Sequence, residues 1–277
     1  MDAYHIALAI LIFILGISIG SFVNVLIFRL RSGVGVSGRS RCMACSKTLH
    51  AGMLIPLFSF LYQRGRCAFC RVRLSLQYPL VEVLLGILYV TILLVRGFDP
   101  LQASFSDILL MLTDMFVWTT LLAITVYDIR HKIIPDSFSL LLAVCGGFAL
   151  FLRYKFGLLH NYSLAFLESG SIPAWIDFFA GPFLALPFAL LWLLSRGRAM
   201  GLGDAKIAWG IGWFLGLPYG ISAIVLSFWI AFFPSLLLLL LPKKRFTMKS
   251  EIPFAPFLVL GTFVVYAWGI NILNWTF

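Results

Sequence analysis

The sequence predicts an all-α, polytopic membrane protein with about eight transmembrane helices. Of its 277 residues, 61% are apolar and only 12% are charged, whereas roughly 25% of residues are charged in an average soluble domain. The mean hydropathy is +1.01. Several apolar runs are long enough to cross a bilayer, and the basic residues gather in alternate loops between these runs, as they do in polytopic membrane proteins.

Seven apolar runs approach the length of about 20 residues that spans the hydrocarbon core of a bilayer. These runs cover residues 6–28, 76–95, 107–127, 134–152, 172–195, 219–241 and 253–275. A shorter run at 205–217 carries three glycines, and we include it as an additional helix.

The distribution of Lys and Arg predicts the orientation, because cytoplasmic loops retain positive charge. With the N-terminus outside, the loops 29–75, 128–133, 196–206 and 242–251 are cytoplasmic and hold 18 of the 21 basic residues. The net charge of +10 follows from this bias and does not indicate nucleic-acid binding. A cleaved signal peptide is not expected, because the first apolar run is too long and basic residues follow it.

The loop 29–75 contains two Cys-x-x-Cys pairs, which indicate four thiolates around one tetrahedral zinc ion. The predicted ligands are Cys42, Cys45, Cys67 and Cys70. A loop of this size buries too little apolar surface to fold securely alone, so metal binding would supply folding energy. Two disulfides are the alternative, although disulfides are rare in the reducing cytoplasm. The nine basic residues of the loop would offset the zinc-thiolate charge and contact anionic lipid.

This loop divides the chain into three parts: a first transmembrane helix at 1–28, the cysteine loop at 29–75 and a membrane-embedded domain at 76–277. The fifth cysteine, Cys145, stands alone in an apolar segment and is expected to be a small core residue.

Seven of the eleven acidic residues lie in or beside the predicted spans, where an ionisable group is costly and is a candidate for function. Capping or a structural hydrogen bond accounts for Asp107, Asp114 and Asp177. Glu82 lies one to two turns inside the second span and has no evident partner in the sequence.

Two further acids are predicted to lie on the cytoplasmic side at similar depth. Asp128 closes the third span and Asp204 opens the short span, behind Gly201 and Gly203. Two carboxyl groups a few ångströms apart share a proton, so that one activates a water molecule and the other protonates a peptide carbonyl. Glycines without Cβ atoms allow backbone to approach closely. Pro135 is expected to fix the start of the fourth span.

The same residues also allow a structural interpretation. Asp204 could cap its helix, and Asp128 could pair with the neighbouring basic residues at the membrane interface. Lys206 could either lower the pKa of a nearby carboxyl group or extend its ammonium to the interface.

The order of motifs resembles the type IV prepilin peptidases, membrane aspartyl proteases of the Gly-x-Gly-Asp type. The resemblance rests on "GSFVNVLIFRL", "CMAC", "GRCAFC", "QYPLVEVLLG", "DIRHKIIPD" and "GLGDAK" and extends over nearly the whole chain. Carried over residue by residue, it makes Asp128 and Asp204 the catalytic pair and the four loop cysteines the zinc knuckles of the longer family members.

This resemblance implies cleavage of a short basic leader from prepilins or pseudopilins, on the cytoplasmic face of the bacterial inner membrane. It also implies methylation of the new N-terminal amine with S-adenosylmethionine. The sequence contains no recognisable loop for that cofactor, so its binding residues are unknown. Asn24 and Glu82 lie in the N-terminal motifs, where both are interpreted as polar groups in helix packing.

Other classes explain part of the pattern. A proton-coupled transporter could use the two aspartates as a relay, but we expect it to place ionisable groups near the bilayer midplane and to show an internal repeat. An assembly factor with a zinc loop leaves the paired aspartate motifs unexplained. A presenilin-type protease shares the Gly-x-Gly-Asp motif without requiring the cysteines. The sequence does not indicate which pilins are cut, or an oligomeric state.

Overall fold

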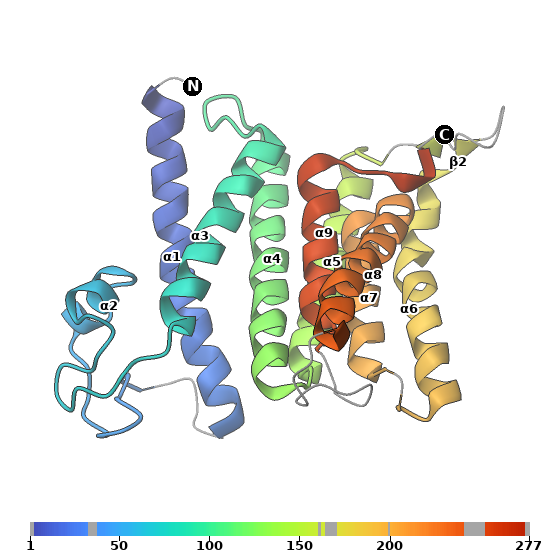
Figure 1. The fold of residues 1–277 in the computed structure, drawn as a ribbon. Coiled ribbons are helices and arrows are strands. Elements are labelled where there is room, and N and C mark those ends of the chain that lie inside the picture. Colours follow the sequence, from blue (N-terminus) through green and yellow to red (C-terminus); the bar gives the residue numbers. More distant parts are fainter. Residues whose placement is uncertain are drawn as a thin grey trace. The chain divides into compact units, whose positions relative to one another are not determined.

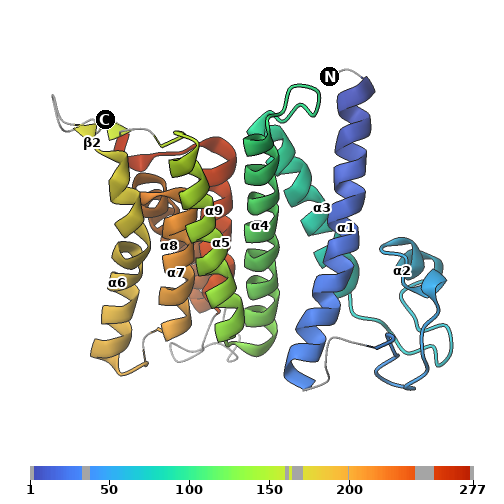
Figure 2. The ribbon, with the colours of Figure 1, turned by 180° about the vertical axis from the view of Figure 1, so that it is seen from behind.

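The structure is a computed structural model that describes residues 3–32, 38–159, 162–163, 171–198, 200–240 and 253–274. The chain forms two compact units, one of residues 1–100 and one of residues 101–277. Long helices dominate both units (Figures 1 and 2), because apolar runs in a membrane satisfy their backbone hydrogen bonds internally as helices.

The first unit is built on two antiparallel helices, α1 (Ala3–Ser32) and α3 (Gln77–Arg96). Their backbones approach closely at Gly16 and Gly20, because a Cβ at these positions would lie 2.7 Å from the Cα of Gly86 and 2.8 Å from the Cα of Glu82. Asn24 on α1 donates to the carbonyl of Tyr78. These contacts fix the register of the pair, and they give Asn24 the packing role that the sequence predicts.

The segment between α1 and α3 contains two short helices, η1 (Ala51–Met53) and α2 (Phe58–Tyr62). Glu82 reaches this segment from α3, because its Oε2 atom accepts a hydrogen bond of 2.9 Å from the backbone N–H of Leu57. A buried acid of a membrane helix is therefore satisfied by the loop domain of the same unit.

The second unit is a helical bundle with one small antiparallel pair of strands, in which Tyr162 is opposite Ile172. Its elements in chain order are α4 (Phe105–His131), α5 (Asp136–Lys155), β1 (Tyr162–Ser163), β2 (Ser171–Ile172), η2 (Ala174–Ile176), α6 (Asp177–Ser195), α7 (Leu202–Leu215), α8 (Leu217–Leu240), α9 (Ala255–Trp268) and η3 (Ile272–Asn274).

The glycine-rich helix α7 lies between α5 and α6. A Cβ at Gly146 of α5 would lie 2.6 Å from the carbonyl oxygen of Gly210, and one at Gly212 would lie 2.6 Å from the carbonyl oxygen of Ala180 on α6. Small residues permit this close approach of backbones, which is a common way to pack helices in membranes. The glycines of the short apolar run therefore set the position of α7 within the bundle.

All eight predicted spans correspond to helices within the described residues. Six of these helices, namely α1, α3, α4, α5, α8 and the segment 174–195, are long and apolar enough to cross a membrane. The helices α7 and α9 have 14 residues each. The predicted cytoplasmic loop 242–251 lies outside the described residues.

Three intramembrane acids have structural partners, as the sequence predicts. Asp107 forms a capping box with Ser104 at the start of α4. The phenol of Tyr266 donates to Asp114 over 2.6 Å, and the N–H of Leu217 donates to Asp177 over 2.8 Å.

Candidate active site

Four helix ends meet at one end of the second unit. The last turn of α4 carries Asp128, and the first turn of α7 carries Asp204. The chain turns tightly from α4 into α5, with Lys132 in the left-handed conformation and Pro135 at the N-cap of α5 (φ −64°, ψ 135°). The start of α9 reaches the same place, because Ala255 contacts Asp128.

Asp128 is buried, with 5% of its surface exposed. Its Oδ2 atom accepts a hydrogen bond of 3.3 Å from the backbone N–H of Ala255, the first residue of α9. The unpaired N–H groups at a helix N-terminus stabilise a negative charge. The α9 terminus therefore directs a partial positive charge at the Asp128 carboxyl group.

Asp204 is also buried, with 7% of its surface exposed. Its carboxyl group interacts electrostatically with that of Asp128. Two carboxyl groups that interact in this way do not both ionise readily. The structure therefore brings together the two acids that the sequence places on separate helices, and the pair can act as a general acid and a general base.

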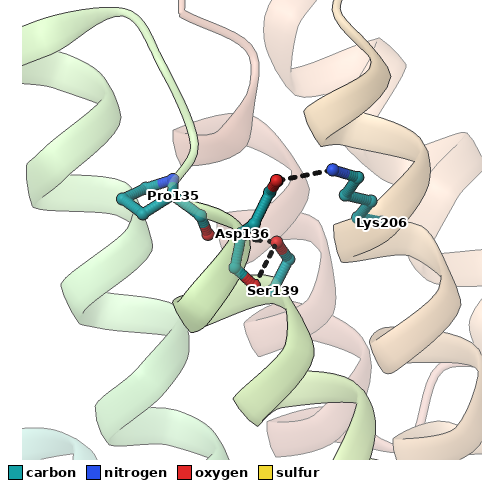
Figure 3. Close-up of polar contacts among 4 residues, drawn as sticks. All are labelled: Pro135, Asp136, Ser139 and Lys206. Atoms are coloured by element: carbon teal, nitrogen blue, oxygen red, sulfur yellow. Dashed lines mark hydrogen bonds and ion pairs between the residues drawn. The ribbon is translucent and has the colours of Figure 1, made fainter.

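Lys206 forms an ion pair with Asp136, with 2.5 Å between its Nζ atom and an Oδ1 atom of the first residue of α5 (Figure 3). The pair is solvent-exposed, at 39% for the lysine side chain and 83% for the aspartate side chain. Ser139 donates to the carbonyl oxygens of Pro135 and Asp136 (Figure 3). This network joins the start of α7 to the start of α5, beside the two buried acids.

The two glycines before Asp204 have different surroundings. A Cβ at Gly203 would lie 2.7 Å from the Cδ1 atom and 2.9 Å from the Cβ atom of Ile134, in the turn between α4 and α5. A Cβ at Gly201 would meet Asp204 Oδ2 at 3.9 Å, an ordinary contact distance. Gly203 thus allows α7 to start against that turn, whereas space remains at Gly201 beside the carboxyl group.

This difference gives a matched test of stability. We expect Gly203→Ala to destabilise the protein by about 1–3 kcal/mol, because the added methyl group overpacks against Ile134. Gly201→Ala should change stability much less, since its backbone conformation (φ −76°, ψ 147°) suits any residue. Thermal unfolding of both variants in detergent measures the difference. Equal midpoints for the two variants would contradict the packing that we describe.

A second candidate site lies in the loop domain of the first unit. The sulfur atoms of Cys42, Cys45, Cys67 and Cys70 all lie within 4.8 Å of one another. The Sγ atoms of Cys42 and Cys70 are 3.8 Å apart, which matches the edge of about 3.8 Å for a tetrahedron with Zn–S bonds of ~2.3 Å. All four cysteines are free thiols. Both the donor set and its dimensions fit zinc.

The two Cys-x-x-Cys pairs sit in equivalent turns. Arg41 bridges to Thr48 around the first pair, and Arg66 bridges to Arg73 around the second. In the second turn, the backbone N–H groups of Cys70 and Phe69 point at the Cys67 sulfur and lower the pKa of Cys67 to about 6. A thiolate is the form that binds a metal, so the turn prepares this residue as a ligand.

Two features around the buried pair of acids are not evident from the sequence. One is Asp136, which has no distinctive signal in the sequence although it closes the segment "DIRHKIIPD". The contact between the start of α9 and Asp128 is also not evident from the sequence. The only local signal of this helix start is Pro256, since proline is frequent in the first turn of a helix; the contact itself joins residues that are far apart in the sequence.

Comparison with known proteins covers most of the chain. Residues 14–95 match the Bacterial Peptidase A24 N-terminal domain, and residues 115–240 match the Type IV leader peptidase family. The chain is 32% identical to a prepilin leader peptidase/N-methyltransferase of Aeromonas hydrophila, over 96% of this chain and 92% of the relative. It is 26% identical to a protein of the same name in Bacillus subtilis strain 168, over 95% and 96% of the two chains. No solved structure matches.

Proposed function

This chain belongs to the type IV leader peptidase family, and from that premise we propose that Asp128 and Asp204 carry out its peptide cleavage. The enzyme removes the leader peptide of prepilins and methylates the N-terminus that cleavage exposes. The comparisons give no support to a proton-coupled transporter. The observation that supports the catalytic pair is the burial of two interacting carboxyl groups at the meeting point of four helix ends.

The surroundings of the two acids assign their roles. The N–H of Ala255 stabilises a negative charge on Asp128, so Asp128 is the ionised member that accepts a proton from the attacking water. Asp204 holds the shared proton and donates it to the oxygen of the scissile carbonyl group. The tetrahedral intermediate then collapses: the peptide C–N bond breaks, the leaving amine takes the proton from Asp128, and a hydroxyl group of the intermediate returns a proton to Asp204.

The position of the pair in the membrane follows from the charge distribution. The loops 128–133 and 196–206 flank Asp128 and Asp204 and contain five of the basic residues, which indicates the cytoplasmic side. The N-terminus then lies outside. The protein is a multi-pass protein of the bacterial inner membrane, and leader cleavage occurs at its cytoplasmic face.

The remaining components are assigned by their chemistry. The cysteine loop at 29–75 holds a structural zinc ion and folds around it within the N-terminal part of the chain. Besides prepilins, pseudopilins are expected as substrates. S-adenosylmethionine supplies the methyl group, in keeping with the N-methyltransferase activity in the names of the relatives. Residues 76–277 form the membrane-embedded peptidase part, with Gly201, Gly203, Lys206 and Pro135 shaping the surroundings of the two aspartates.

The test is cleavage in a defined background. The full chain is co-expressed with a prepilin-type substrate in a bacterium that lacks its own prepilin peptidase, and leader loss is followed by the shift of the substrate on a gel. Mass spectrometry of the processed substrate then detects one added methyl group on its N-terminus. A substrate that keeps its leader, although the enzyme is inserted in the membrane, would overturn the proposal.

Lys206 and Asp136 are expected to act as positioning residues. Exposed ion pairs contribute about 0.2–1 kcal/mol, so removal of either partner in Lys206→Ala or Asp136→Ala should lower the cleavage rate only about two- to fivefold. The double variant should be no worse than either single variant, because both remove the same contact. The exchange of the two charges in Lys206→Asp with Asp136→Lys should restore part of the rate.

Cleavage rates of these four variants and of the unchanged protein measure this coupling. A loss of several orders of magnitude in Lys206→Ala alone, without restoration by the charge exchange, would show that the lysine acts directly in the reaction and would contradict the positioning role.

A further inference from the structure

The loop domain lies alongside the membrane helices of its unit. The contacts between α1 and α3 pair Asn24 with Tyr78 and Gly20 with Glu82. Glu82 lies five residues into α3, which begins at Gln77, and is therefore roughly 7–8 Å along the helix axis from that end. The N–H of Leu57 donates to Glu82, so α2 begins within a side-chain length of this depth. Figures 1 and 2 show α2 beside the lower half of α1.

This depth corresponds to the boundary between lipid headgroups and acyl chains. The 20 residues of α3 give a length of about 30 Å, which matches the hydrocarbon thickness of a bilayer. The end of α3 at Gln77 therefore marks one surface of the hydrocarbon core. Amphipathic segments bind membranes with their apolar side chains about 5–10 Å inside that boundary, which is the level at which Glu82 holds Leu57.

The short helix α2 exposes large apolar side chains at this level. Phe58, Leu61 and Tyr62 are exposed at 70%, 72% and 91%, and Ile55 just before the helix is half exposed. An exposed cluster of this kind marks a surface that contacts another apolar phase. Tyrosine is typical of the membrane interface, where its ring can lie in lipid and its hydroxyl group in water.

The charge around α2 is entirely positive. No acidic residue occurs between Asp2 and Glu82, and Glu82 is buried. The described part of the loop carries seven basic residues, which are Arg39, Arg41, Lys47, Arg64, Arg66, Arg71 and Arg73. Basic clusters next to a membrane span attract anionic lipid headgroups.

We propose that α2 is a membrane anchor of the zinc loop, in which Phe58, Leu61 and Tyr62 insert among the lipids of the adjacent leaflet and the basic side chains contact anionic headgroups. Glu82 holds the anchor at the correct depth through Leu57. Leu57 has φ +60°, a conformation that is uncommon for a branched side chain, so the Glu82 contact also holds a backbone shape that the chain would not adopt freely.

A lipid partner fits these observations better than a protein partner. The exposed side chains lie at the level of the bilayer boundary, set by a contact within the same unit, and the surrounding charge matches anionic lipid. A folded protein partner at this depth would have to enter the membrane surface together with the loop. The inference does not depend on the catalytic assignment, since it concerns only the first unit.

The experiment places a small fluorescent amino acid at position 62 of the full chain and reconstitutes the protein in nanodiscs of phosphatidylcholine and phosphatidylglycerol. Half of the samples contain lipids brominated on the acyl chains near the headgroup, which quench a fluorophore by contact. We expect strong quenching at position 62. The same fluorophore at Gln102, in the exposed turn after α3, should not be quenched, and at Leu94, an exposed apolar position on α3, it should be quenched by lipids brominated deep in the chain.

Further variants separate the anchor from other effects. Glu82→Leu should reduce quenching at position 62 while the bound zinc remains, which shows a loop that is folded but released. Asp204→Asn should leave the quenching unchanged, so that a failure of the anchor and a failure of the catalytic assignment are distinguishable. No quenching at position 62 in the otherwise unchanged protein would overturn the proposal. The water-soluble quencher acrylamide gives a second readout. If position 62 became protected from acrylamide only after a prepilin substrate was added, this would also overturn the proposal, because α2 would then be a substrate-docking surface.

Discussion

Asp128→Asn and Asp204→Asn are each expected to abolish leader cleavage, with a loss of about 10³-fold or more. An asparagine has nearly the same shape as aspartate but neither activates water as a base nor holds the shared proton. The two single losses should be similar, and the double variant should be no slower than either one, because the two acids act as a unit. Leader loss measured over a time course with equal amounts of membrane-inserted enzyme gives the rates.

The matched control is Asp107→Asn on the same helix as Asp128. Asp107 lies in the capping box at the opposite end of α4, so its replacement should cost at most about 1 kcal/mol of stability and leave cleavage nearly unchanged. If either Asp128→Asn or Asp204→Asn still cleaved at a rate close to that of Asp107→Asn, that aspartate would be a helix-capping or interfacial residue, and the catalytic pair would need another member.

Cys67→Ser is expected to remove the metal from the protein. The unchanged protein should carry about one zinc ion per chain, and the variant almost none, because three thiolates in this geometry leave an open position and weaken the site strongly. The loop should then unfold locally, since the metal supplies most of its folding energy. Elemental analysis gives the zinc content, and limited trypsin digestion should reveal new cleavage after the arginines that follow α2, at Arg64, Arg66 and Arg71.

Cys145→Ser is the control for this experiment. Cys145 lies on α5 in the second unit and is not one of the four clustered cysteines, so the variant should keep its zinc and its resistance to trypsin. A chelator should reproduce the effect of Cys67→Ser in the unchanged protein. If a reducing agent exposed the loop to trypsin and a chelator did not, the four cysteines would be paired as disulfides instead.

The helices of this protein follow closely from its sequence. Apolar runs predict membrane helices because each residue must satisfy its backbone locally in lipid, so length and composition are sufficient. The short run at 205–217 is harder to interpret by hydropathy, and only the Lys and Arg distribution argues for it. The structure contains it as α7, Leu202–Leu215, and its glycines pack against α5 and α6.

The cysteine loop also follows from the sequence, because ligand spacing is a local property. Two Cys-x-x-Cys pairs form two similar turns, and each turn presents its pair of sulfur atoms without help from the rest of the fold. The membrane position of α2 does not follow in this way. Glu82 has no evident partner in the sequence, and its partner Leu57 becomes visible only when the loop is folded against α3.

By itself, then, the sequence determined the class of protein, the order of its helices, the cluster of four cysteines and the two aspartates worth testing. Only the tertiary structure decided which groups surround those aspartates. It placed the start of α9 against Asp128. It also paired Lys206 with Asp136, whereas the sequence left open whether this lysine acts on a neighbouring carboxyl group or extends to the membrane interface. The physical reason is that hydropathy and metal-ligand spacing are properties of a few neighbouring residues. The partner of a charged side chain depends instead on the packing of helices that are far apart along the chain.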